Sequence, residues 1–261
     1  MRIAVISDVH GNSWALKNVL IDIEKKKADL IVNLGDSLYG PLNPKETYDL
    51  LQSYDIKSIS GNQDRNIVEN FDKKHENSTL RFVVDELNEN AFFWLKSLPK
   101  SMVLDCGVFM CHGTPNSDTT YLLEKLCDGY VTVNSEQTIE ELLQNVTQKT
   151  IFCGHSHTHR TIETSNKIII NSGSVGLQAY DDDLPMYHKI QNFNRNAHCC
   201  IVERLLLASI GLLSVGTCGG KKARCSQATV MCIFYSFSIC VRKSFICWSF
   251  KPVPSFIVSF V

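Results

Sequence analysis

The chain has no apolar run long enough to cross a membrane as a helix. Residues 205–213 and 228–241 are apolar, but neither reaches the roughly 18 residues that a spanning helix requires. At the start, only four apolar residues separate Arg2 from Ser7, too few for the apolar region of a signal peptide. We therefore expect a protein that is neither exported nor attached to a membrane.

Cysteine spacings typical of metal-binding or disulfide-rich modules are also missing. The eleven cysteines follow neither a CxxC pattern nor the pattern of a small secreted scaffold. This argues against a disulfide framework and favours a reducing, cytoplasmic location. Strand alternation predicts that Cys111 and Cys153 are buried thiols that face the core.

Acidic residues are absent from residues 205–261, which contain six Lys/Arg. Residues 1–204 therefore carry 20 basic and 27 acidic side chains, a net charge of −7. Such a body lacks the basic patch or stripe that binds extended nucleic acids. We expect small-molecule partners and no extended nucleic acid.

Internal repeats and linkers rich in Pro, Gly or Ser are missing from residues 1–203, which predicts one domain there. Residues 204–261 hold five of the eleven cysteines and eight of the 24 aromatic residues, and they show no helical or strand period. We interpret them as an atypical, poorly ordered Cys/Ser/Phe-rich tail. Our hypothesis for its origin is a shifted reading frame or another gene-level rearrangement.

Short apolar runs rich in β-branched residues alternate with stretches of helical period, which predicts a layered α/β domain with parallel strand pairing. The pattern predicts helices at residues 12–26, 44–53, 80–97 and 135–145. It predicts strands at residues 2–6, 29–34, 56–60, 150–153, 160–163, 167–170, 185–191 and 197–203, and two strands within 101–111 joined at Cys106-Gly107.

Five apolar runs each end in residues that can bind a metal. The clusters are Asp8-Val9-His10, Gly35-Asp36, Gly61-Asn62-Gln63-Asp64, His112-Gly113 and Gly154-His155-Ser156-His157. Ligands of open α/β sheets gather outside the carboxyl ends of the strands, so clusters far apart in the chain can meet in one crevice.

Within two of these clusters the candidate ligands lie two residues apart. In an extended backbone, Asp8 and His10 would share one face while Val9 points away, and His155 and His157 would repeat this geometry. The neighbouring glycines allow tight turns and close approach to a ligand.

Two carboxylates, one amide oxygen and four imidazoles exceed what one tetrahedral metal binds, but they suit two ions that share a carboxylate. Asp36 is the expected bridge. Mixed oxygen and imidazole ligands favour two divalent ions, with manganese as the leading expectation and iron, zinc, nickel and magnesium as alternatives. Such a pair can activate a water molecule for phosphate-ester hydrolysis.

These five motifs, in this order, resemble those of the calcineurin-like metallophosphoesterase superfamily: D-x-H, G-D, G-N-x-[DE], an isolated H, and G-H-x-H. The resemblance covers roughly residues 1–203 and is closest to the small bacterial and archaeal phosphodiesterase-type members. Residues 171–176 (NSGSVG) resemble the glycine turn that follows the last histidine motif in that branch.

The resemblance implies a four-layer α-β-β-α sandwich with the active site at the strand ends. It implies one ion held by Asp8, His10, Asp36 and His157, and a second held by Asp36, Asn62, His112 and His155. Catalytic roles are expected for Asp36, Asn62 and His112. The implied reaction is hydrolysis of a small phosphate ester, by a phosphodiesterase or phosphatase, through direct attack of water without a covalent enzyme intermediate.

The chain departs from the superfamily pattern at Gln63, where many members have a histidine that is thought to protonate the leaving group. Glutamine cannot act as an acid near neutral pH, which favours activated diesters over unactivated monoesters. A second departure is the tail, because relatives usually continue past residue 203 with charged, helix-forming sequence.

Several alternatives stay open at this point. The chain could be an inactive binding scaffold of the same fold, as the retromer subunit is, or a hydrolase of nucleotide polyphosphates. Asp64 could orient a ligand or cap a helix, and His159 could face the site or lie at the surface. We interpret His75, His188 and His198 as surface or edge residues, and Asp181-Asp182-Asp183 as a turn.

Overall fold

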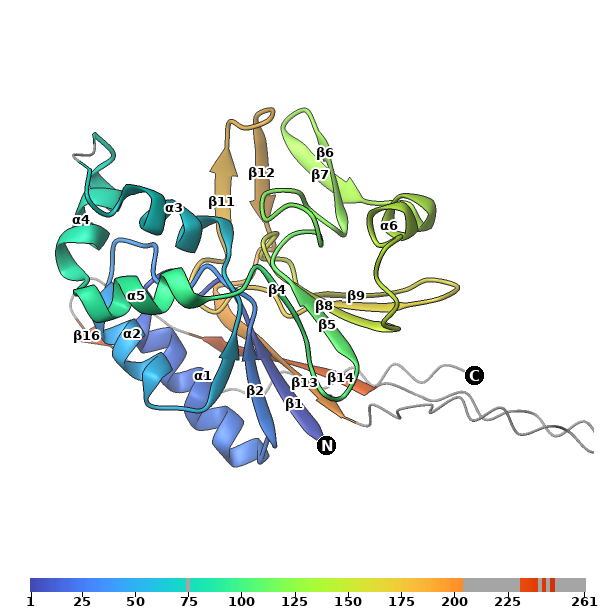
Figure 1. The fold of residues 1–261 in the computed structure, drawn as a ribbon, viewed down its shortest axis with the longest axis horizontal. Coiled ribbons are helices and arrows are strands. Elements are labelled where there is room, and N and C mark those ends of the chain that lie inside the picture. The colour runs from blue at the N-terminus through green and yellow to red at the C-terminus, as the bar shows by residue number, and fades with distance from the viewer. Residues whose placement is uncertain (74–75, 204–230, 239–240, 243–244, 247–261) are drawn as a thin grey trace, which may run out of the picture.

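The computed structural model describes residues 1–73 and 76–203, and the segments 231–238, 241–242 and 245–246 (Figure 1). Residues 204–230 and 247–261, and with them most of the tail whose gene-level origin we questioned, lie outside the described residues, as does His75. No helix among the described residues has the length and apolar character needed to span a membrane.

A first sheet has the strand order β14-β13-β1-β2-β3. The strands are β1 (Arg2–Ile6), β2 (Leu30–Asn33), β3 (Ile56–Ser58), β13 (Asn196–Glu203) and β14 (Met231–Ser238). The expected parallel pairing of β1, β2 and β3 is confirmed. β13 pairs antiparallel with β1, so residues from the two ends of the domain lie side by side.

A second sheet has the order β4-β5-β8-β10-β9. Its strands are β4 (Ser101–Val103), β5 (Val108–Cys111), β8 (Thr150–Cys153), β9 (Arg160–Glu163) and β10 (Ile168–Asn171). β5, β8 and β10 run parallel, while β4 and β9 are antiparallel edge strands.

Three hydrophobic cores confirm the expected α-β-β-α layering. Alternation along β1 sends Ala4 and Ile6 to the core beneath the helices and Ile3 and Val5 to the core between the sheets. The third core lies on the outer face of the second sheet, where it contains Cys111 and Cys153 together with residues of α6 (Glu136–Leu142). Both thiols are buried there, as expected.

Most helix boundaries coincide with the signals in the sequence. Asn12 accepts a hydrogen bond from the Ala15 N–H and caps α1 (Ser13–Lys26), and α2 (Pro44–Gln52) begins with a proline. The expected helix at 80–97 is wrong as one element. It is two helices, α4 (Ser78–Glu86) and α5 (Glu89–Ser97), because Asn88 caps a new helix through the Ala91 N–H.

Among the described residues, seven further elements escaped the period analysis. They are α3 (Asn62–Asn70), the hairpin strands β6 (Glu124–Cys127) and β7 (Tyr130–Val133), and strands β11 (Ala179–Asp182), β14, β15 (Val241–Arg242) and β16 (Phe245–Ile246). The turn expected at Asp181-Asp182-Asp183 is therefore wrong for Asp181 and Asp182. The expectation of no strand period after residue 204 is wrong for β14, β15 and β16. Residues 231–235 of β14 are all apolar and therefore show no alternation.

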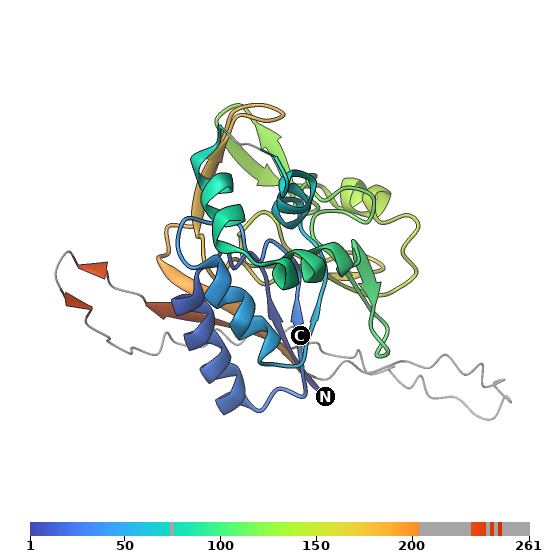
Figure 2. The same ribbon diagram turned by 60° about the vertical axis from the view of Figure 1, so that its left-hand side comes forward.

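Two hairpins project beyond the carboxyl ends of β1, β2 and β3 (Figures 1 and 2). One is β6 and β7, and the other is β11 and β12 (His188–Gln191). The Gly129 N–H donates to the Tyr187 carbonyl at 3.0 Å and joins them. The hairpins therefore stand above the strand ends where the ligand-capable clusters lie.

Candidate metal centre

All seven expected ligands lie at or just after the ends of strands. Asp8 and His10 follow β1, Asp36 follows β2, Asn62 opens α3 after β3, His112 follows β5, and His155 and His157 follow β8. The crevice between the two sheets therefore collects side chains from five separate parts of the chain, as the strand-end argument predicted.

Five of these residues have a left-handed backbone, with φ between 50° and 69°: Asp8, His10, Asp36, His155 and His157. The extended backbone that we expected for the Asp-x-His and His-x-His motifs is therefore wrong. A non-glycine residue in this region costs roughly 1–2 kcal/mol, and such strain concentrates at functional sites. Val9, between the two left-handed residues, points away into the helix-side core.

Glycine is required at two positions where the loops after β2 and β3 approach each other closely. Gly35 has a φ of 100°, and a Cβ there would collide with the backbone nitrogen of Gly61. A Cβ on Gly61 would in turn collide with the Asp36 carboxylate. The loops after β2 and β3 can therefore touch only because both residues lack a side chain.

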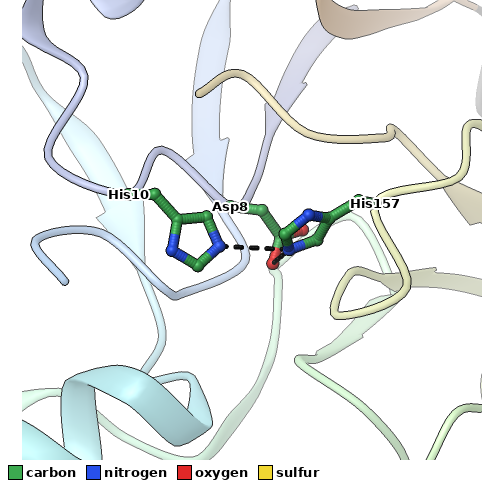
Figure 3. Close-up of side chains that lie close together, drawn as sticks. All are labelled: Asp8, His10 and His157. Carbon is green, nitrogen blue, oxygen red and sulfur yellow. Dashed lines mark hydrogen bonds and ion pairs between the residues drawn. The ribbon is translucent and has the colours of Figure 1, made fainter. Parts of the chain in front are cut away.

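The first group of candidate ligands comprises Asp8, His10 and His157, whose side chains point toward one another (Figure 3). His10 Nε2 lies 3.1 Å from His157 Nε2, and Asp8 Oδ1 lies 3.3 Å from His157 Nε2. All three residues are buried, with at most 8% of their surface exposed. The ligand atoms lie within 4.8 Å of one another, which is close enough for one ion to contact all three.

The second group comprises Asp36, His112 and His155 within the same 4.8 Å limit. Asp36 Oδ2 lies 3.4 Å from His112 Nε2 and 4.0 Å from His10 Nε2 of the first group. Asp36 therefore lies between the two groups, in the position that a bridging carboxylate needs. Asn62 Oδ1 lies 3.0 Å from His112 Nε2 and adds an amide oxygen to this side.

In Asp8 and Asp36, one carboxylate oxygen accepts a backbone hydrogen bond and the other faces the centre. Asp36 Oδ1 accepts from the Gln63 N–H at 2.8 Å, and Asp8 Oδ2 accepts from the His155 N–H at 3.2 Å. The remaining oxygens, Asp36 Oδ2 and Asp8 Oδ1, face the imidazoles. Asp8 Oδ1 is buried with no hydrogen-bond partner among the described residues.

Backbone carbonyls fix the orientation of the imidazoles. His10 Nδ1 lies 2.9 Å from the Tyr39 carbonyl, and His112 Nδ1 lies 2.8 Å from the Leu34 carbonyl. Because a carbonyl only accepts, both Nδ1 atoms donate, and in the neutral ring each Nε2 offers a lone pair to the centre. Metal-binding histidines are typically held by such outer hydrogen bonds.

The pKa shifts reflect an anionic centre that attracts positive charge. Burial would lower the pKa of His112, but Asp36 and Asp8 outweigh it and raise the pKa to about 10. Burial would raise the pKa of Asp36, but His112 outweighs it and the pKa is lowered. Burial and the nearby His112 lower the pKa of His155 to about 4.

Together these features fit two cations rather than a hydrogen-bonded network. Because His10 Nδ1 donates to the Tyr39 carbonyl, a neutral His10 has only a lone pair at Nε2, and this atom lies 3.1 Å from His157 Nε2. The raised pKa of His112 shows that the two carboxylates attract the positive charge that metal ions would supply. Carboxylate, amide and imidazole donors suit divalent ions.

Asp64 caps a helix, one of the two roles that we left open, and it contacts the backbone of the ligand loops rather than a ligand side chain. Its carboxylate accepts from the Gly61 N–H at 3.1 Å and caps α3, and it accepts from the Ser37 N–H at 2.9 Å. It thereby ties together the loops that carry Asp36 and Asn62. Burial and the neighbouring Asp36 raise the pKa of Asp64 to about 7.

Three histidines outside the ligand groups were given roles in the sequence analysis that the structure now tests. His159 belongs to neither ligand group, and its ring packs against His198 with centroids 4.6 Å apart. His188 and His198 are at most 1% exposed, so their interpretation as surface or edge residues is wrong. Buried polar side chains need partners, and sequence spacing alone did not reveal these.

Tyr121, Tyr180 and His188 form a support for the centre that the sequence did not indicate. The Tyr121 hydroxyl lies 2.6 Å from the Tyr180 hydroxyl and 2.8 Å from His188 Nε2. Tyr180 also donates to the His155 carbonyl at 3.0 Å, and its ring packs against His157. The β11–β12 hairpin and the segment just before β6 therefore contribute the side chains that hold the last ligand loop.

A cleft of about 530 Å³ opens directly on the centre. Tyr39, Gly40 and Pro41 line it, together with Gln63. Tyr180, Asp181 and Asp182 of the second hairpin form another part of the wall. Ligands that reach the candidate metals therefore pass between the loop after β2 and this hairpin.

Comparisons with known proteins agree with this architecture. The family model of the calcineurin-like phosphoesterase superfamily domain matches residues 1–190. The uncharacterized protein MJ0912 of Methanocaldococcus jannaschii is 28% identical over 183 residues, covering 67% of this chain and 70% of that protein.

Two solved structures share the fold. A metallophosphoesterase from Sphaerobacter thermophilus is 24% identical with a TM-score of 0.58, covering 77% of this chain and 82% of that one. The hypothetical protein PH1004 from Pyrococcus horikoshii OT3 is 20% identical with a TM-score of 0.59, covering 77% and 83%. With a family model that spans most of the domain and two buried His/Asp groups at its strand ends, the chain belongs to the calcineurin-like phosphoesterase superfamily.

Proposed function

We propose that the protein is a phosphodiesterase that depends on two divalent metal ions. The observation that carries this proposal is the position of Asp36, whose Oδ2 lies within 4.0 Å of ligand atoms from both groups. Asp8, His10 and His157 would hold one ion, and Asn62, His112 and His155 would hold the second. Bound there, the ions would supply Lewis-acid activation of a water molecule and neutralise charge on the phosphoryl oxygens.

The protein's own residues would position the reaction. The ligand loops are fixed by backbone hydrogen bonds to Asp8, Asp36 and Asp64 and need little rearrangement when substrate binds. Asn62 and His112, at the floor of the centre, would bind or orient the phosphoryl group. Five of the seven ligand residues are buried, which largely shields the centre from bulk water outside the cleft.

The cleft favours a diester with a good leaving group. Gln63 lines the cleft beside Asn62, and its side-chain oxygen accepts from Asn66 Nδ2 at 3.3 Å. An amide has no proton to give near neutral pH. Leaving groups that depart as stable anions would therefore react faster than alkoxides that need protonation.

The proposal is tested with full-length protein that has been stripped of metal and reloaded with Mn²⁺. We expect turnover of bis-p-nitrophenyl phosphate that exceeds turnover of p-nitrophenyl phosphate. Asp36→Asn should abolish it, while Asp55→Asn, which removes an exposed carboxylate far from the centre in sequence, should not. A folded protein that binds two equivalents of metal and hydrolyses neither ester would refute catalysis and favour a binding scaffold.

A further inference from the structure

The wall of the cleft beyond the candidate ligands carries negative charge without any basic partner in the lining. It is formed in part by Tyr39, Pro41, Leu42, Tyr180, Asp181 and Asp182. Across the part of the chain that the structure describes, no lysine or arginine lines this cleft. A substrate that extends outward from the metals therefore meets aromatic, apolar and acidic groups.

Basic groups near the centre lie elsewhere. Arg65 and Lys100 line a separate cavity of about 200 Å³ beside His112. Arg65 is engaged by Asp118 through two hydrogen bonds, from Nε at 2.7 Å and from Nη2 at 3.1 Å. This bidentate pairing largely neutralises its charge. Neither Arg65 nor Lys100 lines the large cleft, so neither can bind a second anionic group of the substrate there.

Asp182 is the carboxylate best placed to act on the substrate. It lies two residues after Tyr180 in β11 and therefore on the same face of the strand as that cleft-lining ring. Asp181 also borders the cleft, but strand alternation directs its side chain to the other face of β11, and its cross-strand partner Lys189 in β12 offsets part of its charge. Asp181 and Asp182 are both exposed at the cleft.

We infer that the substrate is a phosphodiester whose second organic group is cationic, with a neutral group tolerated and an anionic group rejected. This inference rests on the proposed function and specifies its substrate class. The phosphoryl charge would be bound at the metal centre, while the organic group would lie between Tyr39, Tyr180 and Asp182. Aromatic faces and a carboxylate attract an organic cation, whereas a second phosphate would be repelled by the like charge of Asp182.

The test uses three p-nitrophenyl phosphodiesters that share a leaving group and differ in the second substituent. The substituents are choline, its neutral isostere 3,3-dimethylbutanol, and the anionic 3-hydroxypropanesulfonate. We expect kcat/KM to fall in that order. In the double variant Asp181→Asn/Asp182→Asn, the ratio between the cationic and anionic esters should shrink by roughly threefold to tenfold, the range for two exposed charge interactions.

Asp183→Asn is the matched control, because it removes the same charge from the next residue, which is exposed but does not line the cleft. It should leave the ratio unchanged. A second readout needs no turnover: isothermal titration calorimetry should give tighter binding of phosphocholine than of 3,3-dimethylbutyl phosphate, and the double variant should lose the difference.

The outcomes separate the two proposals. If folded, metal-loaded protein hydrolyses none of the three esters, the proposed function fails, and the calorimetric comparison still decides the charge preference. If all three esters react with equal kcat/KM, or the anionic ester reacts best, the inference is overturned while the phosphodiesterase stands. A ratio that is unchanged in the double variant, or that Asp183→Asn alters equally, also overturns it.

Discussion

The Tyr121 hydroxyl lies 2.6 Å from the Tyr180 hydroxyl, although the two residues are 59 positions apart. His188 Nδ1 faces the Met186 carbonyl at 2.8 Å and must donate to it, so Nε2 accepts from Tyr121. Tyr180 then shares its proton between the Tyr121 oxygen and the His155 carbonyl. This chain of hydrogen bonds connects the buried His188 to the ligand loop.

Tyr121→Phe should therefore destabilise the protein by about 1–3 kcal/mol, because it leaves His188 Nε2 buried without a donor. Tyr180→Phe should cost about 1 kcal/mol, since it removes a hydrogen bond from a partly exposed residue. Urea denaturation of metal-free protein measures both. Equal losses would show that the His188 contact contributes nothing specific.

Metal removal and replacement should reveal two sites. We expect wild-type protein to retain two equivalents of Mn²⁺ after dialysis. His157→Ala should retain only one of them. Asp36→Ala should weaken both, because its carboxylate lies between the groups. His159→Ala is the matched control, since His159 belongs to neither group and should keep both equivalents. Elemental analysis after dialysis gives the counts, and loss of metal in the control would contradict the assignment.

Asp64→Asn should reduce metal affinity or activity by about 10–100-fold, the range for residues that orient metal ligands. The substituted amide can accept only one of the hydrogen bonds from Ser37 and Gly61, and its NH₂ opposes the other N–H. Glu69→Gln, on the exposed side of the same helix, serves as the control. Calorimetric titration with Mn²⁺ measures the affinities, and equal values for the two variants would remove Asp64 from the positioning role.

Glu124 should make the stability depend on pH. The side chain is 4% exposed, with Arg160 Nε 3.4 Å away, and burial raises its pKa to about 7 from the ordinary 4.5. The folded state then binds the proton more tightly than the unfolded state. Its stabilising contribution is complete below pH 4.5 and is lost as the pH rises to about 7.

Glu124→Gln removes this titration, so the difference in unfolding free energy between wild type and variant should change across that interval. The change is at most on the order of 3 kcal/mol. Urea denaturation at several pH values, with a chelator present, measures it. A difference that stays constant with pH, or that grows in favour of the wild type as pH rises, would contradict the assigned pKa direction.

Much of the fold was predictable because local signals agreed with tertiary structure. The apolar runs of β1, β2, β5 and β8 each end where a glycine or a polar residue begins, so strand ends and candidate ligands were found together. The order of layers followed from the alternation of helical and strand periods.

What escaped prediction depends on contacts between distant segments. α3 is short and polar, and it begins where Gly61 and Asp64 form its cap against the loop after β2. Tyr121 and His188 are 67 residues apart, so no local spacing signals their contact. The left-handed ligand backbones also escaped, because a two-residue spacing suits both an extended strand and a tight turn.

At the left-handed residues of the centre, thermal stability and metal binding favour different side chains. Glycine at His10 or His157 would relieve backbone strain of roughly 1 kcal/mol and should give a more heat-resistant metal-free protein than alanine at the same position. The same change would delete a candidate ligand. Selection for thermal resistance and selection for activity therefore pull these positions in opposite directions, and the strained side chains persist only while their donor atoms are needed.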